Sequence, residues 1–301
     1  MMSSSCIFQT IGIVGVICIV LFVLAAPVYG VFIAVKCCRK RQKALNSTQH
    51  PYRNNTSRPL AITRISPPPL PPFGLDSLIR EKMIIKAPDA VRVVVEQLVV
   101  KSWDSKLSGL GRDASGLSHA RIEINNVYIV HNNSLKAEYE VGYDTALQRL
   151  LQIESTTSNC ERTPIQTAQA LSKIPNVPPD VFSLRTGETL LFHGTSRINV
   201  PEIIQHGLKA EKNTRSPYGK GTYLSDSAQK ADQYTDTQGT RTNKGLTMFL
   251  VRVALGWTVK EEFRHLDCDT VVAGSGKLFQ EFVAKRDDFL LPQILIEYNR
   301  V

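Results

Sequence analysis

The sequence predicts an α+β protein in which one N-terminal membrane-spanning helix precedes a single folded domain. Residues 11–35 are almost wholly apolar, residues 44–77 are rich in Ser, Asn and Pro, and strand-like and helix-like segments alternate from residue 78 to residue 301. A hydrophobic content of 43% with 21% charged residues suits a domain that has a buried core. The chain length of 301 residues leaves room for one domain of about 200 residues.

The N-terminal segment has the length and composition of a membrane span. No charged residue occurs before Lys36, and the apolar run 11–35 exceeds the roughly 20 residues that cross a bilayer core. Residues 36–43 then carry five basic side chains, and basic flanks stay on the cytosolic side. We therefore expect a single-pass membrane protein with a short extracytosolic segment, 1–10, and a folded domain, 78–301, on the cytosolic side.

A cleaved signal peptide is the alternative interpretation of this segment. The absence of a basic region before the apolar run, and the length of that run, argue against it. Glycosylation sequons at Asn46, Asn54, Asn55 and Asn132 would suit a lumenal domain, so the alternative stays open. Cys37 and Cys38 beside the membrane fit either palmitoylation or plain interfacial thiols.

The remaining composition narrows the classes of partner. The net charge is +9, and the five basic residues of 36–43, with no acidic residue among them, contribute +5 to it, which favours anionic lipid over nucleic acid. The six cysteines show no spacing typical of a zinc site, so no metal is expected. The proline-rich run 66–74 predicts an extended linker, and it leaves open a membrane adaptor that gathers partners through this run.

Within the folded domain, the hydrophobic pattern places each element in turn. Residues 121–130 alternate as a strand does, and residues 135–153 have helical spacing. Further on, the pattern predicts more strands and two more helices. Ser225 or Asp226 is expected near the N-cap of the helix at 227–234. The predicted strands are 189–196, the segment after the glycine turn 218–221, 247–255, 277–283 and 293–298, and the predicted helices are 200–208 and 227–234.

Taken singly, the polar residues of this region are typical of structural positions. A lone His193, Tyr223, Tyr234 or Glu281 is more often packed or solvated than functional, and Gly219-x-Gly lacks the spacing of a Walker A loop. Together, three motifs resemble the catalytic domain of the poly(ADP-ribose) polymerase family, which is related to diphtheria toxin. They are Phe192-His-Gly-Thr, Gly219-Lys-Gly-Thr-Tyr-Leu-Ser-Asp, and Glu281-Phe-Val followed by Leu291-Pro-x-x-Leu-Ile.

The resemblance covers about residues 180–298, with a fainter echo in 109–135. It implies the ADP-ribosyltransferase fold of that family, which has two packed, mostly antiparallel β-sheets with flanking helices. It also implies that NAD+ is the substrate and that ADP-ribose passes to protein acceptors while nicotinamide leaves. An NAD+ glycohydrolase or a non-catalytic NAD+-binding membrane adaptor is the alternative.

The resemblance also assigns the site residues. His193, Tyr223 and Glu281 correspond to the catalytic triad. By resemblance, His193 holds the adenosine ribose, Gly194 bonds the carboxamide, Tyr223 and Tyr234 sandwich the nicotinamide ring, and Glu281 accepts a hydrogen bond from the ribose 2′-OH. The remaining expected NAD+ contacts are Thr195, Gly221 and Ala231.

A departure from the family pattern occurs at Ala231, where members often have a serine that bonds the carboxamide. Losing one neutral hydrogen bond costs about 1 kcal/mol, so we expect weaker NAD+ binding with activity retained. Retention of Glu281 leaves polymer elongation open, and the short loop between Leu208 and Tyr218 favours transfer of a single ADP-ribose unit.

Overall fold

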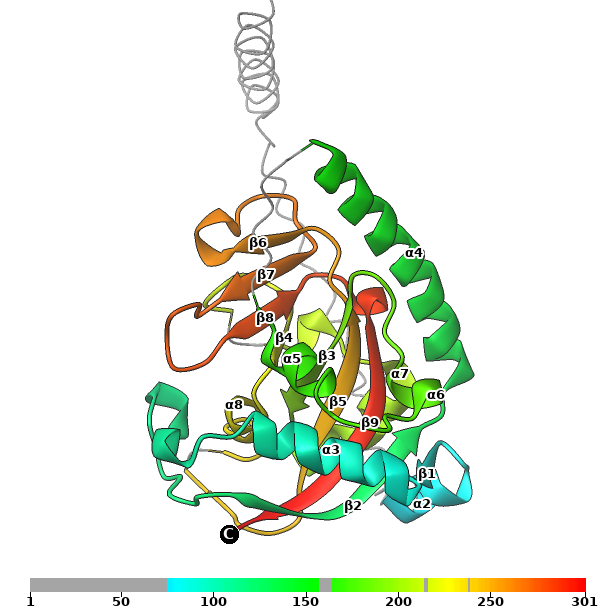
Figure 1. The fold of residues 1–301 in the computed structure, drawn as a ribbon. Helices are drawn as coiled ribbons and strands as arrows, with labels where there is room; N and C mark the ends of the chain where they lie inside the picture. The colour runs from blue at the N-terminus through cyan, green and yellow to red at the C-terminus, as the bar shows by residue number, and fades with distance from the viewer. Residues whose placement is uncertain (1–74, 157–163, 214–215, 238) are drawn as a thin grey trace, which may run out of the picture. The chain divides into compact units, whose positions relative to one another are not determined.

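The computed structural model describes residues 75–156, 164–213, 216–237 and 239–301 (Figure 1). The predicted span 11–35, the basic segment 36–43 and the linker up to residue 74 lie outside the described residues. Within the described ranges, no helix combines the length and the apolar character that crossing a bilayer requires.

The described residues form one sheet of nine strands with helices against it, which confirms the α+β class. The strand order is β1-β2-β9-β5-β3-β4-β8-β7-β6, and all neighbours are antiparallel except β6 and β7. The strands are β1 (Ile84–Lys86), β2 (Ile122–Val130), β3 (Glu188–Gly194), β4 (Thr222–Ser225), β5 (Leu246–Ala254), β6 (Thr258–Lys260), β7 (Thr270–Ala273), β8 (Glu281–Ala284) and β9 (Leu290–Arg300).

The expected pair of sheets is corrected by the hydrogen bonding. One continuous sheet replaces the two expected sheets, and its two halves are β1-β2-β9-β5-β3 and β4-β8-β7-β6. The halves are joined through a single registered residue pair, Phe192 with Ser225. By contrast, β3 pairs with β5 along seven positions, from Glu188 to Gly194. Strand patterns in a sequence reveal the strands, whereas pairing between edges depends on tertiary contacts, so the junction could not be foreseen.

The helices lie against both faces of the sheet, and Figure 1 shows α3 crossing the strands β9 and β5. In α3 the buried residues Val91, Val94, Val95 and Leu98 follow the spacing of one helix face. The helices are α2 (Leu75–Arg80), α3 (Asp89–Lys101), α4 (Asn133–Thr156), α5 (Gln166–Leu171), α6 (Pro179–Phe182), α7 (Val200–His206) and α8 (Ala228–Asp232).

Alternation along the central strands divides the core into two layers. Leu190 and Phe192 of β3 pack in the cluster that contains α3, whereas Leu191 packs in the cluster that contains α2 and α7. Successive strand residues point to opposite faces, so this division follows from the apolar run Thr189–Phe192. Because all of that run is buried, β3 is held from both sides and presents its C-terminal end, His193 and Gly194, to a defined place.

Most predicted elements are present, with two corrections near the site. The strand predicted for 277–283 begins only at Glu281, because Gly274 and Gly276 have φ of +74° and +77° and turn the chain before it. The helix predicted for 227–234 is α8, and its N-cap is Ser227, whose hydroxyl accepts the N–H of Lys230, in place of Ser225 or Asp226. The strands at 121–130 and 247–255 and the helix at 135–153 are confirmed by β2, β5 and α4.

A buried ion cluster joins the end of β9 to the chain after α8. The side chain of Arg300 is 0% exposed, and its Nε lies 2.9 Å from Oδ1 of Asp232. Its Nη1 lies 2.5 Å from Oδ2 of Asp236, and Tyr298 Oη donates to Asp232 Oδ1 at 2.5 Å. Removing one partner from a buried ion pair leaves an uncompensated buried charge, so this cluster should dominate local stability.

We predict that Arg300→Met lowers the free energy of unfolding by about 3–5 kcal/mol, because two carboxylates would then be buried without a cation. Urea unfolding measures the change, and Arg80→Met, at an exposed position, is the matched control with an effect under about 0.5 kcal/mol. Equal effects of the two substitutions would contradict the importance of the cluster.

The same cluster predicts a dependence of stability on pH. Burial acts to raise the pKa of Asp236, but hydrogen bonds from Arg300, the Thr242 N–H and Arg241 outweigh it and hold that pKa below the usual 3.8. A lowered folded-state pKa adds stability above the usual pKa, and this stability is lost as pH falls through the folded value. We therefore expect the part of the Arg300→Met effect that arises from Asp236 to shrink below about pH 4 in the same urea titrations.

Candidate active site

A cavity of about 1390 Å³ opens beside the junction of the two sheet halves. Residues from the end of β3, from β4, from the start of β8 and from α8 line it, together with the segments 111–113 and 274–279. Its volume exceeds the roughly 300–1,000 Å³ of sites for drug-sized molecules, so the cavity has room for a larger, extended ligand.

The cavity brings together most of the residues singled out in the sequence. His193, Tyr223 and Glu281 all line it, as do the other expected contacts apart from one. Those other lining residues are Gly194, Thr195, Ala231 and Tyr234. Gly221 is not among them: a Cβ at this position would lie 2.6 Å from the carbonyl oxygen of Ala284, so its small size serves the close approach of β4 to β8.

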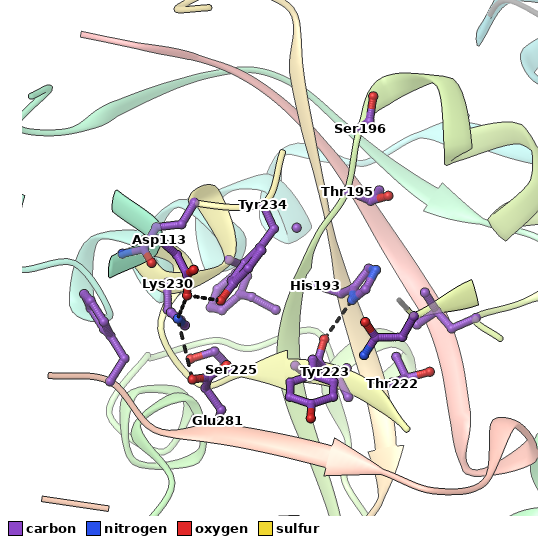
Figure 2. A pocket seen from close by; sticks show the side chains of 18 of the residues that line it. Asp113, His193, Thr195, Ser196, Thr222, Tyr223, Ser225, Lys230, Tyr234 and Glu281 are labelled. Atoms are coloured by element: carbon purple, nitrogen blue, oxygen red, sulfur yellow. Dashed lines mark hydrogen bonds and ion pairs between the residues drawn. The ribbon is translucent and has the colours of Figure 1, made fainter. Parts of the chain in front are cut away.

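His193 links the two sheet halves through its side chain. Its Nδ1 lies 2.9 Å from the carbonyl oxygen of Tyr223, so Nδ1 is the nitrogen that donates (Figure 2). Burial lowers the pKa of His193, and the carbonyl of Tyr223 only partly offsets this effect. The ring is therefore neutral near pH 7, and Nε2 is left as a hydrogen-bond acceptor for a ligand hydroxyl.

Tyr223 forms a fixed aromatic wall at the start of β4. Its hydroxyl accepts the N–H of Tyr218 at 2.9 Å and donates to the carbonyl oxygen of Gly219 at 3.0 Å. The Tyr218 ring lies nearly parallel to it, with centroids 6.4 Å apart. Gly219 has a φ of +106°, which suits glycine in this turn. The glycine-rich motif thus closes on its own tyrosine and holds the ring in place.

Glu281 lies at the start of β8, where Ser225 of β4 is its partner in register. Its side chain is 15% exposed, and Oε1 lies 3.5 Å from Nζ of Lys230. Burial raises the pKa of Glu281 and outweighs the lowering by Lys230. The carboxylate is therefore a desolvated negative charge at the cavity wall, which the buried cation of Lys230 holds in position.

Tyr234 and Lys230 share a second carboxylate, that of Asp113 (Figure 2). Tyr234 Oη donates to Asp113 Oδ2 at 2.7 Å, and Lys230 Nζ lies 3.2 Å from the same oxygen. The ammonium of Lys230 is also 4.9 Å from the centre of the Tyr234 ring. Together with Glu281, which Lys230 also approaches, these three side chains form one connected group in the cavity.

The end of β3 and α8 approach each other more closely than a side chain would allow. A Cβ added to Gly194 would lie 1.7 Å from the carbonyl oxygen of Ala231. Glycine at position 194 therefore has a packing reason that is independent of any ligand. The same contact places Ala231 beside Gly194, at the position where a serine is common in the family that the sequence resembles.

Sequence reasoning missed Lys230 and Asp113. Lys230 precedes Tyr234 by four residues on the predicted helix, so a shared face could have been foreseen. Asp113 lies between α3 and β2, within the segment 109–135 that faintly echoes the family, but the resemblance assigned it no role in the site. Among the described residues, no group of three or more His, Cys, Asp or Glu side chains could hold a metal ion, and the absence of a metal stays a prediction.

Comparison with known proteins gives one result that bears on this geometry. No curated protein matches the chain closely enough to be reported as a relative. The family model described as the poly(ADP-ribose) polymerase catalytic domain matches residues 118–294, more than half of the 301 residues. The matched range contains His193, Tyr223 and Glu281. The chain therefore belongs to the poly(ADP-ribose) polymerase catalytic domain family.

Proposed function

We propose that this protein transfers ADP-ribose from NAD+ to protein acceptors and releases nicotinamide. We further propose that each acceptor site receives a single ADP-ribose unit. The observation that supports this most directly is the joint position of His193, Tyr223 and Glu281 on one cavity that is large enough for a dinucleotide. Membership of the family indicates an NAD+-using ADP-ribosyltransferase. The product length and the acceptors are part of the proposal.

In the proposed reaction, the aromatic rings orient the leaving group. Tyr223 and Tyr234 both line the cavity, and stacking against them would hold the nicotinamide ring. The neutral His193 would accept a hydrogen bond from the adenosine ribose through Nε2. Nicotinamide leaves as a neutral molecule, so the site has to orient it and does not have to protonate it.

Glu281 would supply the electrostatic part of catalysis. Cleavage of the C–N glycosidic bond develops positive charge on the ribose, as in other glycoside cleavages. A fixed carboxylate that accepts the ribose 2′-OH hydrogen bond stabilises that transition state more than the ground state. Desolvation of Glu281 strengthens this interaction, because water competes less for the carboxylate. An acceptor group then attacks C1 of the ribose.

Two segments that meet beside Glu281 favour transfer of a single unit. A Cβ added to Gly111 would lie 3.5 Å from Leu278, so the segments 111–113 and 274–279, which both line the cavity, come close to each other there. We propose that an acceptor reaches Glu281 between these two segments, where a bulky group such as a second ADP-ribose has little room. An extended protein side chain needs less space there.

We predict that Glu281→Gln lowers labelling of protein by radioactive NAD+ roughly 100- to 1,000-fold, because the amide lacks the negative charge that stabilises the transition state. The full chain is incubated with labelled NAD+ and resolved on denaturing gels. Asp144→Asn, at an exposed position on α4, is the control and should label as the unmodified protein does.

The pattern of labelling distinguishes the alternatives. A sharp labelled band indicates one unit, whereas a smear indicates polymer and would contradict the proposed product length. Release of nicotinamide without any labelled protein would indicate an NAD+ glycohydrolase. Equal labelling by the Glu281→Gln variant would remove this carboxylate from the proposed mechanism.

A second prediction concerns the departure at Ala231. We expect Ala231→Ser to lower the KM for NAD+ by roughly fivefold with a nearly unchanged kcat, because the added hydroxyl restores a hydrogen bond worth about 1 kcal/mol. Initial rates of nicotinamide release over a range of NAD+ concentrations measure both constants. An unchanged KM would show that no carboxamide group lies within reach of residue 231.

We further propose that residues 11–35 hold the catalytic domain at a membrane, on its cytosolic side. The uncharged apolar run and the five basic residues of 36–43 support this topology. We expect deletion of 11–35 to move the protein from the membrane fraction to the supernatant after carbonate extraction. A mobility shift of the full chain on glycosidase treatment would contradict the cytosolic placement, since Asn132 lies in the folded domain.

A further inference from the structure

The segment 104–115, which precedes the family-matched residues 118–294, is tied to α8 and the chain that follows it. At its start, the N–H of Asp104 donates to Gln229 Oε1 at 3.1 Å. At its end, Arg241 Nη2 donates to the carbonyl oxygen of Asp113 at 2.7 Å, and Arg241 Nε donates to that of Ser115 at 3.2 Å. The segment is therefore held on the side of the cavity where α8 carries its functional residues.

Arg241 is itself held firmly, so this attachment is more than a surface contact. Its side chain is 9% exposed and pairs with Asp236 at 2.5 Å. Asp236 in turn belongs to the buried cluster around Arg300. The backbone of Asp113 is thus connected to the cluster that fixes the end of β9.

The carboxylate of Asp113 has two partners, and both line the cavity. Its Oδ2 accepts from Tyr234 Oη at 2.7 Å and from Lys230 Nζ at 3.2 Å. Lys230 Nζ also lies 3.5 Å from Glu281 Oε1, while the lysine side chain is only 9% exposed. One poorly hydrated ammonium group therefore lies between two carboxylates, and each of them receives only part of its charge.

We propose that Asp113 is a positioning residue of the active site, which holds Tyr234 in its ring orientation and keeps Lys230 from pairing with Glu281 alone. The inference rests on the proposed function, because Tyr234 and Glu281 are its NAD+-facing groups. Asp113 acts through these two residues and is not assigned a contact with the reacting atoms.

The first effect concerns the ring of Tyr234. This residue is 41% exposed, so the surrounding side chains cover only part of its surface. The hydrogen bond to a carboxylate is charge-assisted and roughly twice as strong as one between neutral groups. Because Asp113 is anchored by Arg241, the bond fixes the ring before any ligand arrives, and a preorganised ring costs less entropy on stacking.

The second effect concerns the charge on Glu281. Without Asp113, Lys230 would donate fully to Glu281 and compete with the ribose 2′-OH for the same oxygen atoms. The ionisable groups that face Glu281 are Lys230 from α8, Asp113 from the 104–115 segment, Lys277 from the preceding turn, and the hydroxyls of Tyr223 and Tyr234. Burial and the charge of Asp113 raise the pKa of Glu281, while Lys230 and Lys277 lower it.

Two substitutions separate the two effects, and both are made in the full chain. Asp113→Asn keeps an oxygen that accepts from Tyr234 but removes the charge, whereas Asp113→Ala removes both. Asp144→Asn on α4 is the control for loss of one surface charge. We expect Asp113→Ala to raise the KM for NAD+ roughly tenfold, the effect of about 1.4 kcal/mol, and Asp113→Asn to raise it less.

The pH profile of kcat/KM provides a readout that a merely structural residue would not change. Removing a negative charge and releasing Lys230 both lower the pKa of Glu281, so the acid limb should move to lower pH in both variants. The control should keep the profile of the unmodified protein. A thermal unfolding midpoint within a few degrees of the unmodified protein shows that each variant is folded.

A direct titration keeps this test independent of turnover. The full chain is labelled with carbon-13 at the glutamate carboxyl carbons, and Glu281→Gln identifies the signal of Glu281. A lower pKa of Glu281 in Asp113→Asn, with no change in Asp144→Asn, supports the inference even where no nicotinamide release is detected. An inactive unmodified protein would overturn the proposed function alone. An unchanged or higher pKa of Glu281 in Asp113→Asn would overturn the role of Asp113.

Discussion

The buried guanidinium of Arg300 is the contact on which the arrangement around α8 depends. It joins the last residue of β9 to Asp232 at the end of α8 and to Asp236 just beyond it. Tyr234 lies between these two aspartates in the chain, so its backbone is fixed on both sides. A central strand thereby sets the position of a helix of only five residues, α8, which would not be stable alone.

From Arg300 towards the cavity, positively and negatively charged side chains follow one another in contact. Arg300 binds Asp236, Asp236 binds Arg241, and Arg241 holds the backbone of Asp113. The Asp113 carboxylate then binds Lys230, which reaches Glu281. Each buried charge has a partner of opposite sign, which is the condition under which charges persist in a poorly hydrated interior. The series ends at Glu281, which shares the ammonium group of Lys230 with Asp113. Because its charge is only partly neutralised, Glu281 is the group best able to stabilise a developing positive charge.

Local chain geometry predicted the elements that carry two of the site residues. His193 follows a buried run that had to be a strand, and Tyr223 follows a glycine turn that leads into another strand. The strand and the turn could be inferred because strand ends and turns leave patterns over a few residues. The site roles of His193 and Tyr223 came from the resemblance to the family. The start of β8 was placed four residues too early, since the turn at Gly274 and Gly276 depends on their φ, which hydrophobic pattern does not reveal. Asp113 lies in the faintly matching segment 109–135, but its place in the cavity depends on tertiary contacts with Arg241 and Lys230, which no local pattern reveals.

The pairing of β3 with β4 through a single residue pair explains why the cavity lies where it does. A fully paired edge would use the polar groups of both strands, but these strands register only at Phe192 and Ser225. Beyond that pair the strands no longer bond to each other, and His193 and Gly194 line the cavity from β3. The imidazole of His193 bonds the carbonyl of Tyr223, which keeps the junction closed at one point. An uninterrupted ladder would add stability to the sheet, but it would leave no strand edge on which a ligand could be bound.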